Sequence, residues 1–305
     1  LAKIHGDLAL NEITESNVDE YVEQCQKLKF KGAPISPGSI AKRLDTIKAM
    51  FSYAVSVDLL QFSPGTSVKA PRDTRPKTTQ SWKSFEKHEV QKLVATATEL
   101  WTERRSPPKG RSHDLITALH CLVWTGARPE EICQLRCDDL DIDLCAIKIT
   151  NYVTADGARE RRVKNQRSAR EVPIHSRLRP IIERHLGRTN EGLFFPTFEP
   201  VASKRELRIA EETGQPLEIN GRYARAISRQ WTDHLRGLIV PGEPRKVLYS
   251  LRHSWAAESR RRGMPEFVRN AIMGHADDNP HAARYGSDAD WLSEKLTHVQ
   301  RMECM

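Results

Sequence analysis

The stretch SPGTSVKAPRDTRPKTTQ, residues 63–80, constrains the fold of this chain more than any other part of the sequence. It is rich in Pro, Lys, Arg and Thr and contains few apolar side chains, a composition typical of a linker between domains. The chain has 305 residues, and at about 100–200 residues per domain this length favours about two domains. We therefore predict a helical domain over residues 1–70, a basic linker over 71–85 and a larger domain over 86–305.

The net charge of the chain indicates which kinds of binding partner it favours. The formal net charge is +8 at pH 7 and the pI is about 9.2, a surplus of Lys and Arg that is typical of proteins that bind nucleic acid or a membrane surface. Composition alone does not distinguish these two classes. No apolar run approaches the ~18–20 residues needed to span a bilayer, and the N-terminal residues LAKIHGDLALNEI lack the basic and apolar segments of a signal peptide.

The cysteines argue against a disulfide scaffold and against a metal site. They are scattered along the chain at Cys25, Cys121, Cys133, Cys137, Cys145 and Cys304. This is too sparse for a secreted disulfide framework, so we expect a reduced, cytoplasmic protein with no membrane partner. Three of them have the spacing C-x3-C-x7-C, which matches no standard zinc finger. We therefore expect no metal and no cofactor.

The N-terminal domain has a helical pattern. Ser36-Pro37 begins a helix, because Pro suits the first helical turn. One face of this helix is apolar at helical spacing: Ile40, Leu44, Ile47, Phe51 and Ala54. Lys42 and Arg43 lie on other faces. A second helix is predicted over ESNVDEYVEQCQKLKF, residues 15–30, so a compact helical domain with a basic surface is expected.

The larger domain shows mainly helical patterns. We predict helices over 85–100, 113–126, 176–186, about 219–237, 250–262, 266–273 and 289–302. A further helix begins at Pro129, with two Glu residues in a first turn that favours negative charge.

Strands are predicted in the middle of this domain. The segment 145–153 is β-branched and apolar, like a strand. Residues 158–174 are predicted to form a hairpin with a basic turn at Asn165–Ala169. Residues 198–218 are a loop or an insertion whose form the sequence does not indicate.

Four segments of the larger domain stand out. They are TGARPEEICQL at 125–135, Lys164 in the predicted hairpin turn, YSLRHSWAAE at 249–258, and IMGHADDNPHAARYG at 272–286. Each segment alone has a structural explanation. Arg128 fits a surface ion pair at a helix start, Lys164 fits a solvated turn, Arg252 fits a simple DNA-backbone contact, and His253 fits a buried hydrogen-bonding residue.

In this order and at these separations, the four segments resemble the tyrosine recombinases of the phage-integrase family. The resemblance covers residues 120–290 and the order of the domains. It implies a multidomain, mainly α protein: a small all-α core-binding domain followed by an α+β catalytic domain with a small antiparallel sheet. The catalytic residues that it implies are Arg128, Lys164, Arg252, His275 and the nucleophile Tyr285, with Glu131 and His253 in supporting roles.

One position departs from the family pattern. The residue three positions before Arg252 is usually His in this family and is Tyr249 here. The family residue assists proton transfer at the nucleophile or the leaving group. A tyrosine can form a hydrogen bond, but its pKa of about 10 makes it a poor general base at neutral pH. We expect Tyr249 to bond the phosphate or to support the packing of the site.

The resemblance implies a reaction that needs neither metal nor ATP. Two guanidinium groups, Arg128 and Arg252, would neutralise the phosphodiester, and His275 would add a donor. Tyr285 would form a 3′-phosphotyrosine while Lys164 protonates the departing 5′-oxygen. The function implied is that of a site-specific recombinase, the integrase of a prophage or mobile element. Two alternatives are a non-cleaving DNA-binding relative and a type IB topoisomerase-like enzyme.

The implied partners are double-stranded DNA, bound in a clamp between the two domains, and three further copies of the chain. A homotetramer would act on two DNA sites, and accessory DNA-bending proteins and association with the nucleoid are also expected. The expected DNA-binding residues are Lys42, Arg43, Lys69, Arg72, Arg75 and Lys77. The apolar stripe of the C-terminal helix, 289–302, is expected to dock on a neighbouring protomer or to fold back on its own.

Overall fold

The computed structural model of the chain describes residues 6–30, 32–74, 82–103, 111–150, 152–153, 159–161, 169–199, 204–214, 222–275 and 288–303. The chain divides into two compact units, Leu1–Ser81 and Trp82–Met305. Each unit has its own hydrophobic core. Among the described residues, no helix is both long and apolar enough to cross a membrane.

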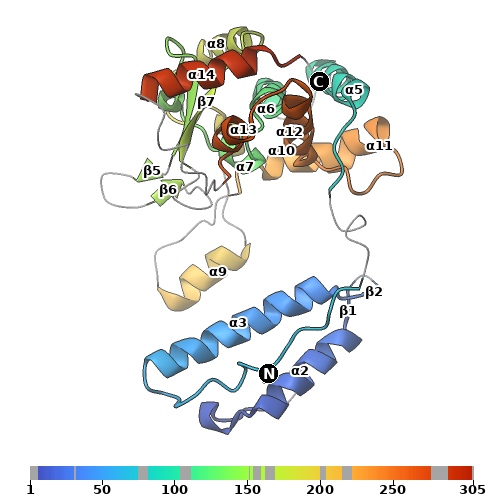
Figure 1. Ribbon diagram of the computed structural model, residues 1–305, viewed down its shortest axis with the longest axis vertical. Coiled ribbons are helices and arrows are strands. Elements are labelled where there is room, and N and C mark those ends of the chain that lie inside the picture. The colour runs from blue at the N-terminus through green and yellow to red at the C-terminus, as the bar shows by residue number, and fades with distance from the viewer. Residues whose placement is uncertain are drawn as a thin grey trace. The chain divides into compact units, whose positions relative to one another are not determined.

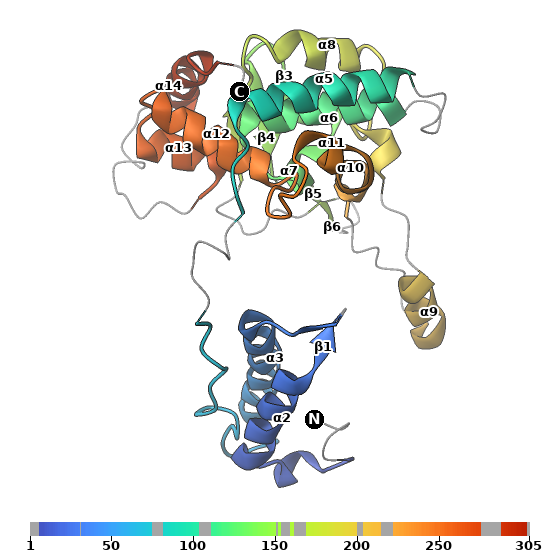
Figure 2. The same ribbon diagram turned by 90° about the vertical axis from the view of Figure 1, so that its right-hand side faces the viewer.

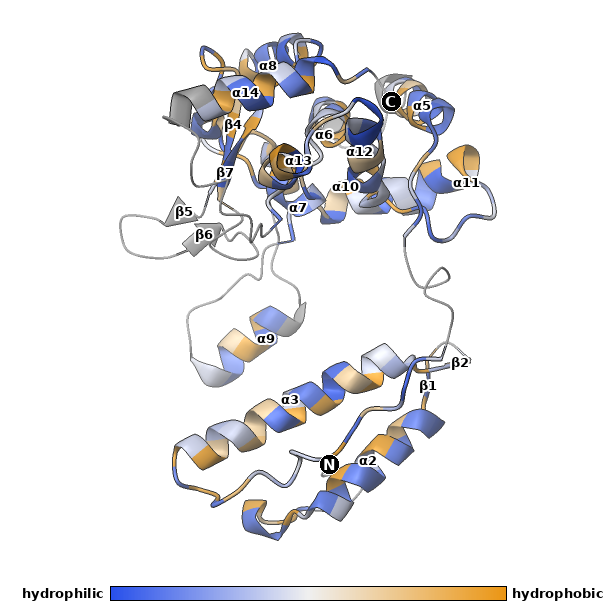
Figure 3. Cartoon of the chain, viewed as in Figure 1, coloured by the Kyte–Doolittle hydropathy of each residue, from blue (hydrophilic) through white to orange (hydrophobic). Residues whose placement is uncertain are grey.

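The first unit is built on two helices. Its elements are the 3₁₀ turn η1 (Leu10–Glu12), α2 (Glu15–Lys27), β1 (Lys29–Phe30), β2 (Ala33–Pro34) and α3 (Pro37–Ser56). The side-chain oxygens of Thr14 and Ser36 accept from the first-turn amides of α2 and α3, which satisfies donors that a helix start leaves unpaired. In Figure 3 hydrophobic and hydrophilic residues alternate along both helices, as expected for helices with one buried face.

The core of the first unit confirms the apolar stripe predicted for α3. Ile40, Leu44 and Phe51 are buried against residues of α2, including Val18 and Val22. The predicted helix over 15–30 ends early, at Lys27. Its last two residues instead form β1, which pairs antiparallel with β2, and Ile35 N–H donates to the carbonyl of Leu28 at 3.1 Å.

The second unit is mainly helical. Its α-helices are α5 (Lys87–Glu103), α6 (Arg111–Thr125), α7 (Pro129–Cys133), α8 (Arg179–Leu186), α9 (Lys204–Thr213), α10 (Arg225–Gln230), α11 (Arg236–Ile239), α12 (Ser250–Arg261), α13 (Glu266–Met273) and α14 (Asp288–Gln300). Short turns of other helix types are η2 (Cys137–Asp139), η4 (Pro196–Phe198) and the π-helical turn η5 (Trp231–Leu235), which joins α10 to α11.

Helix α6 lies at the centre of this unit. It packs against α5, α7, α8 and α12, and Figures 1 and 2 both show α5 and α6 side by side. Leu115, Leu119 and Leu122 of α6 are buried. Because α6 is apolar on most of its surface, it needs partners on several sides, and its C-terminal end is therefore fixed inside the domain.

The small sheet has the order β3–β4–β7, with β3 (Leu140–Asp141), β4 (Ala146–Ile149) and β7 (Arg170–Pro173) all antiparallel. Two strands that lie between β4 and β7 in the sequence, β5 (Tyr152–Val153) and β6 (Arg159–Arg161), pair with each other. The predicted hairpin over 158–174 is therefore wrong, since its two strands have different partners. Val172 is buried and joins the apolar strand β4, whereas the sequence RER of β6 offers no apolar side chain to that core.

Helices form at the predicted places in the second unit, but several begin or end at other residues than predicted. The helix over 266–273 is confirmed at both ends, and that over 250–262 ends one residue early. The predicted helix 176–186 begins at Arg179, because residues 175–178 form a turn. The helix from Pro129 is only five residues long. The segment 198–218 contains α9.

The C-terminal helix folds back on its own domain. Helix α14 packs on β7, and Lys295 Nζ donates to the carbonyl of Glu171 at 2.8 Å. Val299 and Met302 are buried in the core of the second unit. Trp291 stacks on Phe267 of α13, with ring centroids 6.0 Å apart. Of the two arrangements expected for this helix, the structure has the intramolecular one.

Candidate active site

The candidate site forms where the C-terminal ends of α6 and α13 lie close to the beginning of α12. Arg252, on α12, is 2% exposed. Its Nη1 donates to the carbonyl of Gly126 at 2.7 Å, and its Nη2 donates to the carbonyl of Met273 at 2.6 Å. One buried guanidinium thus ties the turn after α6 to the C-terminus of α13.

Both turns at this site require glycine. Gly126 has φ +64°, and a Cβ there would lie 2.6 Å from the ring of Trp255. Gly274 caps α13 with φ +66°, and a Cβ there would lie 2.7 Å from Arg170 Nη1. Positive φ is costly for other residues, so the Thr-Gly and Gly-His pairs of the sequence have a backbone reason as well as a steric one.

Arg128 stands at the start of α7 and is held by Glu131. The backbone N–H of Arg128 donates to Glu131 Oε2 at 2.8 Å, and Arg128 Nη1 donates to Oε1 at 2.6 Å. Arg128 Nη2 lies 3.5 Å from the carbonyl of Gly274, to which it donates. The sequence PEEIC allows this because Glu131 occupies the third helical position, from which a carboxylate reaches back to the residue before the helix.

A second arginine, Arg170 of β7, shares the same carboxylate. Its Nη2 and Nη1 donate to the two oxygens of Glu131 at 2.9 and 3.2 Å, and its Nε donates to the carbonyl of Ile272 at 2.6 Å. The sequence prediction missed Arg170, which it placed in a hairpin. A signal was available: Arg170 and the apolar Val172 are two residues apart, and such residues share one face of a strand.

The charges at this site perturb one another. Burial raises the pKa of Glu131, but hydrogen bonds and charge from Arg170 and Arg128 outweigh it, so its pKa lies below the usual value. Burial, together with the charge of Arg128, lowers the pKa of Arg252 to about 10. Partial desolvation and the nearby charges of Arg252 and Arg128 also lower the pKa of His275. The imidazole of His275 is therefore neutral at pH 7, with one donor and one acceptor nitrogen.

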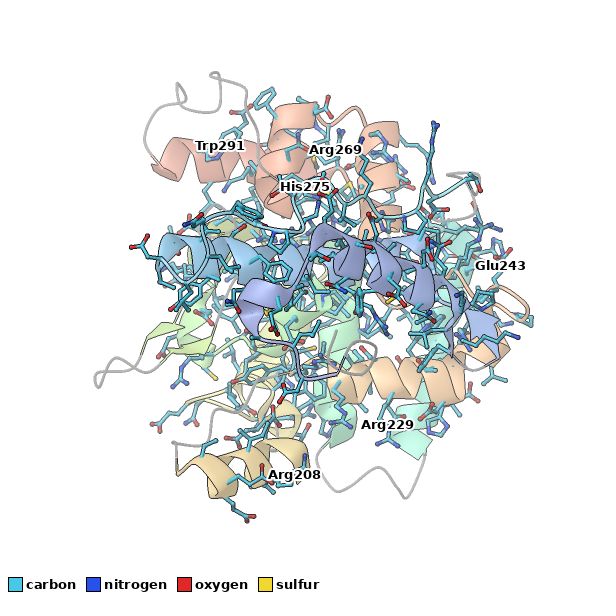
Figure 4. The ribbon with its side chains drawn as sticks, turned by 90° about the horizontal axis from the view of Figure 1, so that it is seen from below. Arg208, Arg229, Glu243, Arg269, His275 and Trp291 are labelled. Atoms are coloured by element: carbon cyan, nitrogen blue, oxygen red, sulfur yellow. The ribbon has the colours of Figure 1, made fainter. Side chains whose placement is uncertain are left out.

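A hollow of about 300 Å³ opens beside this network. Its wall includes Arg252 and His275 together with Tyr249 and His253, which lie one turn apart on α12. The rings of Tyr249 and His253 are edge to face, with centroids 5.4 Å apart. Burial and the charges of Arg252 and Arg260 lower the pKa of His253. Figure 4 shows His275 next to Arg269, a further residue of this wall.

The predicted site residues fall into three groups. Arg128, Glu131, Arg252 and His275 meet at the turn that follows α13, and Tyr249 and His253 line the adjoining hollow. The predicted residues that lie outside the described part of the chain are Lys164, Tyr285, Arg75 and Lys77. Those that are exposed on the first unit are Lys42, Arg43, Lys69 and Arg72.

The thiols and carboxylates of the described ranges form no metal-binding arrangement. Among these residues no three His, Cys, Asp or Glu side chains are grouped as ligands of a metal ion. Cys133 and Cys121 are buried free thiols, and burial raises both pKa values. These two cysteines are core residues rather than reactive groups.

Comparison with known proteins gives concordant results. The model of the phage integrase family matches residues 83–290. A curated tyrosine recombinase of Pseudothermotoga lettingae is 21% identical over 278 residues, covering 90% of this chain and 78% of the relative.

Two solved structures share the fold. The integrase of transposon Tn1549, in complex with a circular intermediate DNA, has a TM-score of 0.54 at 15% identity, covering 92% of this chain and 86% of its own. A lambda integrase dimer bound to a COC′ core site has a TM-score of 0.53 at 15% identity, covering 92% and 84%. At these identities the likeness shows the fold alone.

Proposed function

The chain belongs to the phage integrase family of tyrosine recombinases, and from this premise we propose that it cuts and rejoins DNA at a specific site through a covalent 3′-phosphotyrosine. The proposed nucleophile is Tyr285. The proposed substrate is double-stranded DNA, and the proposed biological role is the integration or excision of a prophage or other mobile element.

One observation carries this proposal. Arg128 and Arg252, from two different helices, donate to the carbonyls of the consecutive residues Gly274 and Met273, directly before His275. Two guanidinium groups and an imidazole are thereby held at one turn, beside a hollow that is open to solvent. This is the arrangement that a phosphodiester in its transition state requires, because negative charge increases on its non-bridging oxygens.

Each of these groups has a definite task in the proposed reaction. Guanidinium groups stay charged at every relevant pH and bind two phosphate oxygens at once. His275 is neutral and donates one further hydrogen bond. Loss of one such fixed donor typically lowers the rate about 10²–10³-fold. Glu131 and Arg170 hold Arg128 in place and are positioning residues.

The covalent steps follow from the residues that the sequence supplies. Tyr285 gives its phenolic proton to solvent, its oxygen attacks phosphorus, the bond from phosphorus to the 5′-oxygen breaks, and Lys164 gives a proton to that oxygen. A 5′-hydroxyl of another strand then attacks the phosphotyrosine and gives its proton to the neutral Lys164. The bond from phosphorus to the phenol oxygen breaks, and that oxygen takes a proton back from solvent. The bond energy is kept throughout, so the proposed reaction consumes no ATP and requires no metal.

The proposed assembly is a homotetramer on two DNA sites, with accessory DNA-bending proteins, at the nucleoid in the cytoplasm. The first unit would bind the DNA backbone through Lys42, Arg43, Lys69, Arg72, Arg75 and Lys77. Tyr249 lines the hollow with Arg252, which supports a role in contacting the phosphate.

A trapping experiment tests the proposal without a known site. The protein is incubated with sheared DNA of its host and element, denatured in SDS, and the DNA that stays covalently attached is sequenced. We expect the wild type to capture a defined sequence and Tyr285→Phe to capture none. Binding without capture by both proteins would instead support the non-cleaving alternative, and relaxation of a supercoiled plasmid by the monomer would support the topoisomerase-like one.

A further inference from the structure

Arg269 is a buried arginine in the wall of the hollow. The proposed reaction assigns no role to it. It lies on α13, is 8% exposed, and shares the wall with Arg252, Arg260 and His275. Figure 4 shows Arg269 and His275 close together beside α13.

The ion pair of Arg269 does not explain its burial. Within the described residues its guanidinium has one hydrogen bond, from Nη2 to Glu266 Oε1 at 3.0 Å. The side chain of Glu266 is 78% exposed, and a pair with so exposed a partner contributes little. The buried side-chain nitrogens that lack a partner in the described residues do not include those of Arg269, so its guanidinium keeps donors that face the hollow although the residue as a whole is buried. A guanidinium has five N–H donors, and this residue is therefore suited to a ligand that arrives from outside.

The chemistry of that ligand follows from the wall of the hollow. Three arginines, Arg252, Arg260 and Arg269, line it with a single acidic residue, Glu266. The charge of Arg269 also contributes to the low pKa of His275, so the two side chains act on the same space. The volume of about 300 Å³ equals that of roughly ten water molecules, which is more than one phosphate group needs.

We propose that Arg269 binds a second phosphate of the DNA strand, adjacent to the phosphate that Arg252 holds, and that Glu266 occupies the guanidinium until DNA replaces it. Arg260, which is exposed at the rim of the same hollow, faces the same stretch of backbone. This inference rests on the proposed function, since it assumes that a DNA strand enters the hollow.

The first test is the salt dependence of DNA binding. Affinity for a short duplex of fixed sequence is measured between about 50 and 200 mM salt, where each phosphate contact contributes about 0.9 to the slope of log K against log salt. We expect Arg269→Gln to reduce the slope by about one and Arg269→Lys to keep it. The matched control is Arg179→Gln, which removes the same charge from an exposed i,i+4 pair with Glu183 on α8.

The second test concerns the replacement of Glu266 by DNA. Glu266→Gln should tighten binding in the wild-type background, because no carboxylate then competes for the guanidinium. In the Arg269→Gln background the same change should have a smaller effect, since the competition no longer exists. This double-mutant cycle separates the proposed exchange from the general loss of one negative charge.

Each outcome bears on a definite claim. Equal slopes for Arg269→Gln and Arg179→Gln, or an equal effect of Glu266→Gln in both backgrounds, would overturn the second phosphate site. The wild-type protein tells the two proposals apart: if it binds DNA and captures it covalently while Arg269→Gln behaves like the control, only this inference fails. If the wild type shows no salt-dependent binding, the proposed function fails with it.

Discussion

Glu131 is the residue on which the geometry of the site depends most. It is 4% exposed, and both its oxygens accept from arginines of different elements, Arg128 at the start of α7 and Arg170 on β7. Removing the charge of one buried partner leaves the others uncompensated, which is far more costly than the loss of a surface pair. The carboxylate therefore fixes Arg128, the proposed phosphate ligand, and also joins the sheet to the helices.

The first prediction concerns this carboxylate. Glu131→Gln should lower the free energy of unfolding by about 3 kcal/mol, because the buried guanidinium of Arg170 and the partly buried one of Arg128 lose their counter-charge. Urea unfolding measures the change. The control is Glu183→Gln, whose carboxylate is 45% exposed and whose loss should cost about 1 kcal/mol or less. Equal destabilisation by the two variants would contradict the role assigned to Glu131.

The second prediction is a pH dependence that arises from His275. Its folded-state pKa lies below the unfolded value of about 6.5, so near pH 6 the unfolded chain binds more protons than the folded one. The arginines that lower this pKa besides partial burial are Arg252, Arg128, Arg170 and Arg269. The contribution of His275 to stability is thus complete above pH ~6.5 and is lost as the pH falls from there toward the folded-state pKa.

Urea midpoints between about pH 5.5 and 8 measure this effect. We expect the wild type to lose stability toward pH 5.5 more steeply than His275→Gln. A dependence that is the same in His275→Gln and the wild type would show that the arginines do not act on this imidazole.

The residues of the site differ in how far the sequence could predict them. Arg128, Arg252 and the Gly-His pair belong to short motifs, which can be recognised in the sequence without knowing how the domain packs. Arg170 and Arg269 belong to no such motif; the one signal for Arg170 was its place on the same strand face as Val172. Their burial depends on tertiary contacts with Glu131 and with the hollow.

At the scale of elements, α14 completes the core of the second unit. Val299 of α14 and Met302, just after the helix, are buried. The carbonyl of Met302 accepts from His175 Nε2 at 3.1 Å, and Glu303 forms ion pairs with Lys87 and Arg262. The helix is thus a structural part of the domain.

The third prediction is the consequence for truncation. Deletion of residues 289–305 should unfold or aggregate the second unit, because it removes these buried side chains. Val299→Ala should lower the free energy of unfolding by about 2 kcal/mol through the cavity it leaves, whereas Thr297→Ala, at an exposed position of the same helix, should change it by about 0.5 kcal/mol or less. A stable truncated protein that still binds DNA would contradict this placement of α14.

The helices were better predicted than the strands, for a physical reason. A helix such as α13 is defined by its own periodicity and by Pro and Gly at its ends, so its bounds can be read locally. Strands need partners, and the sequence around β6 and β7 does not say which strand each will join. Burial of Val172 beside β4 decided the pairing, and that burial is a property of the whole domain.

At the scale of the whole molecule, the two units have separate hydrophobic cores. One consists of residues of the first unit only, around Phe51 and Leu44, and the other of residues from Phe85 onward. Val68 belongs to the first core, while Ser254 Oγ accepts from the N–H of Phe85 at 2.7 Å in the second. A part of a chain that has its own core can in principle fold alone.

The fourth prediction follows from these separate cores and from the proposed division of DNA binding between the units. The fragment 82–305 should fold cooperatively. Its melting temperature should lie within a few degrees of that of the second unit in the full chain. It should bind a duplex more weakly than the full chain does. The slope of log K against log salt should be smaller by about one for each phosphate that the first unit binds in the full chain. Calorimetry and binding titrations on the two proteins measure both quantities.

A full-length variant distinguishes weaker DNA binding from a failure to fold. Lys42→Gln combined with Arg43→Gln keeps the apolar residues of the first core, to which neither exposed side chain belongs, although it removes the contact of 4.0 Å from Arg43 Nη1 to Cys25 Sγ. The double variant should move the salt slope part of the way toward that of the fragment. An insoluble fragment would mean that the second core needs the first unit. A fragment with the full wild-type slope would mean that the phosphates are all bound by the second unit, and the DNA-binding role proposed for Lys42 and Arg43 would then be wrong.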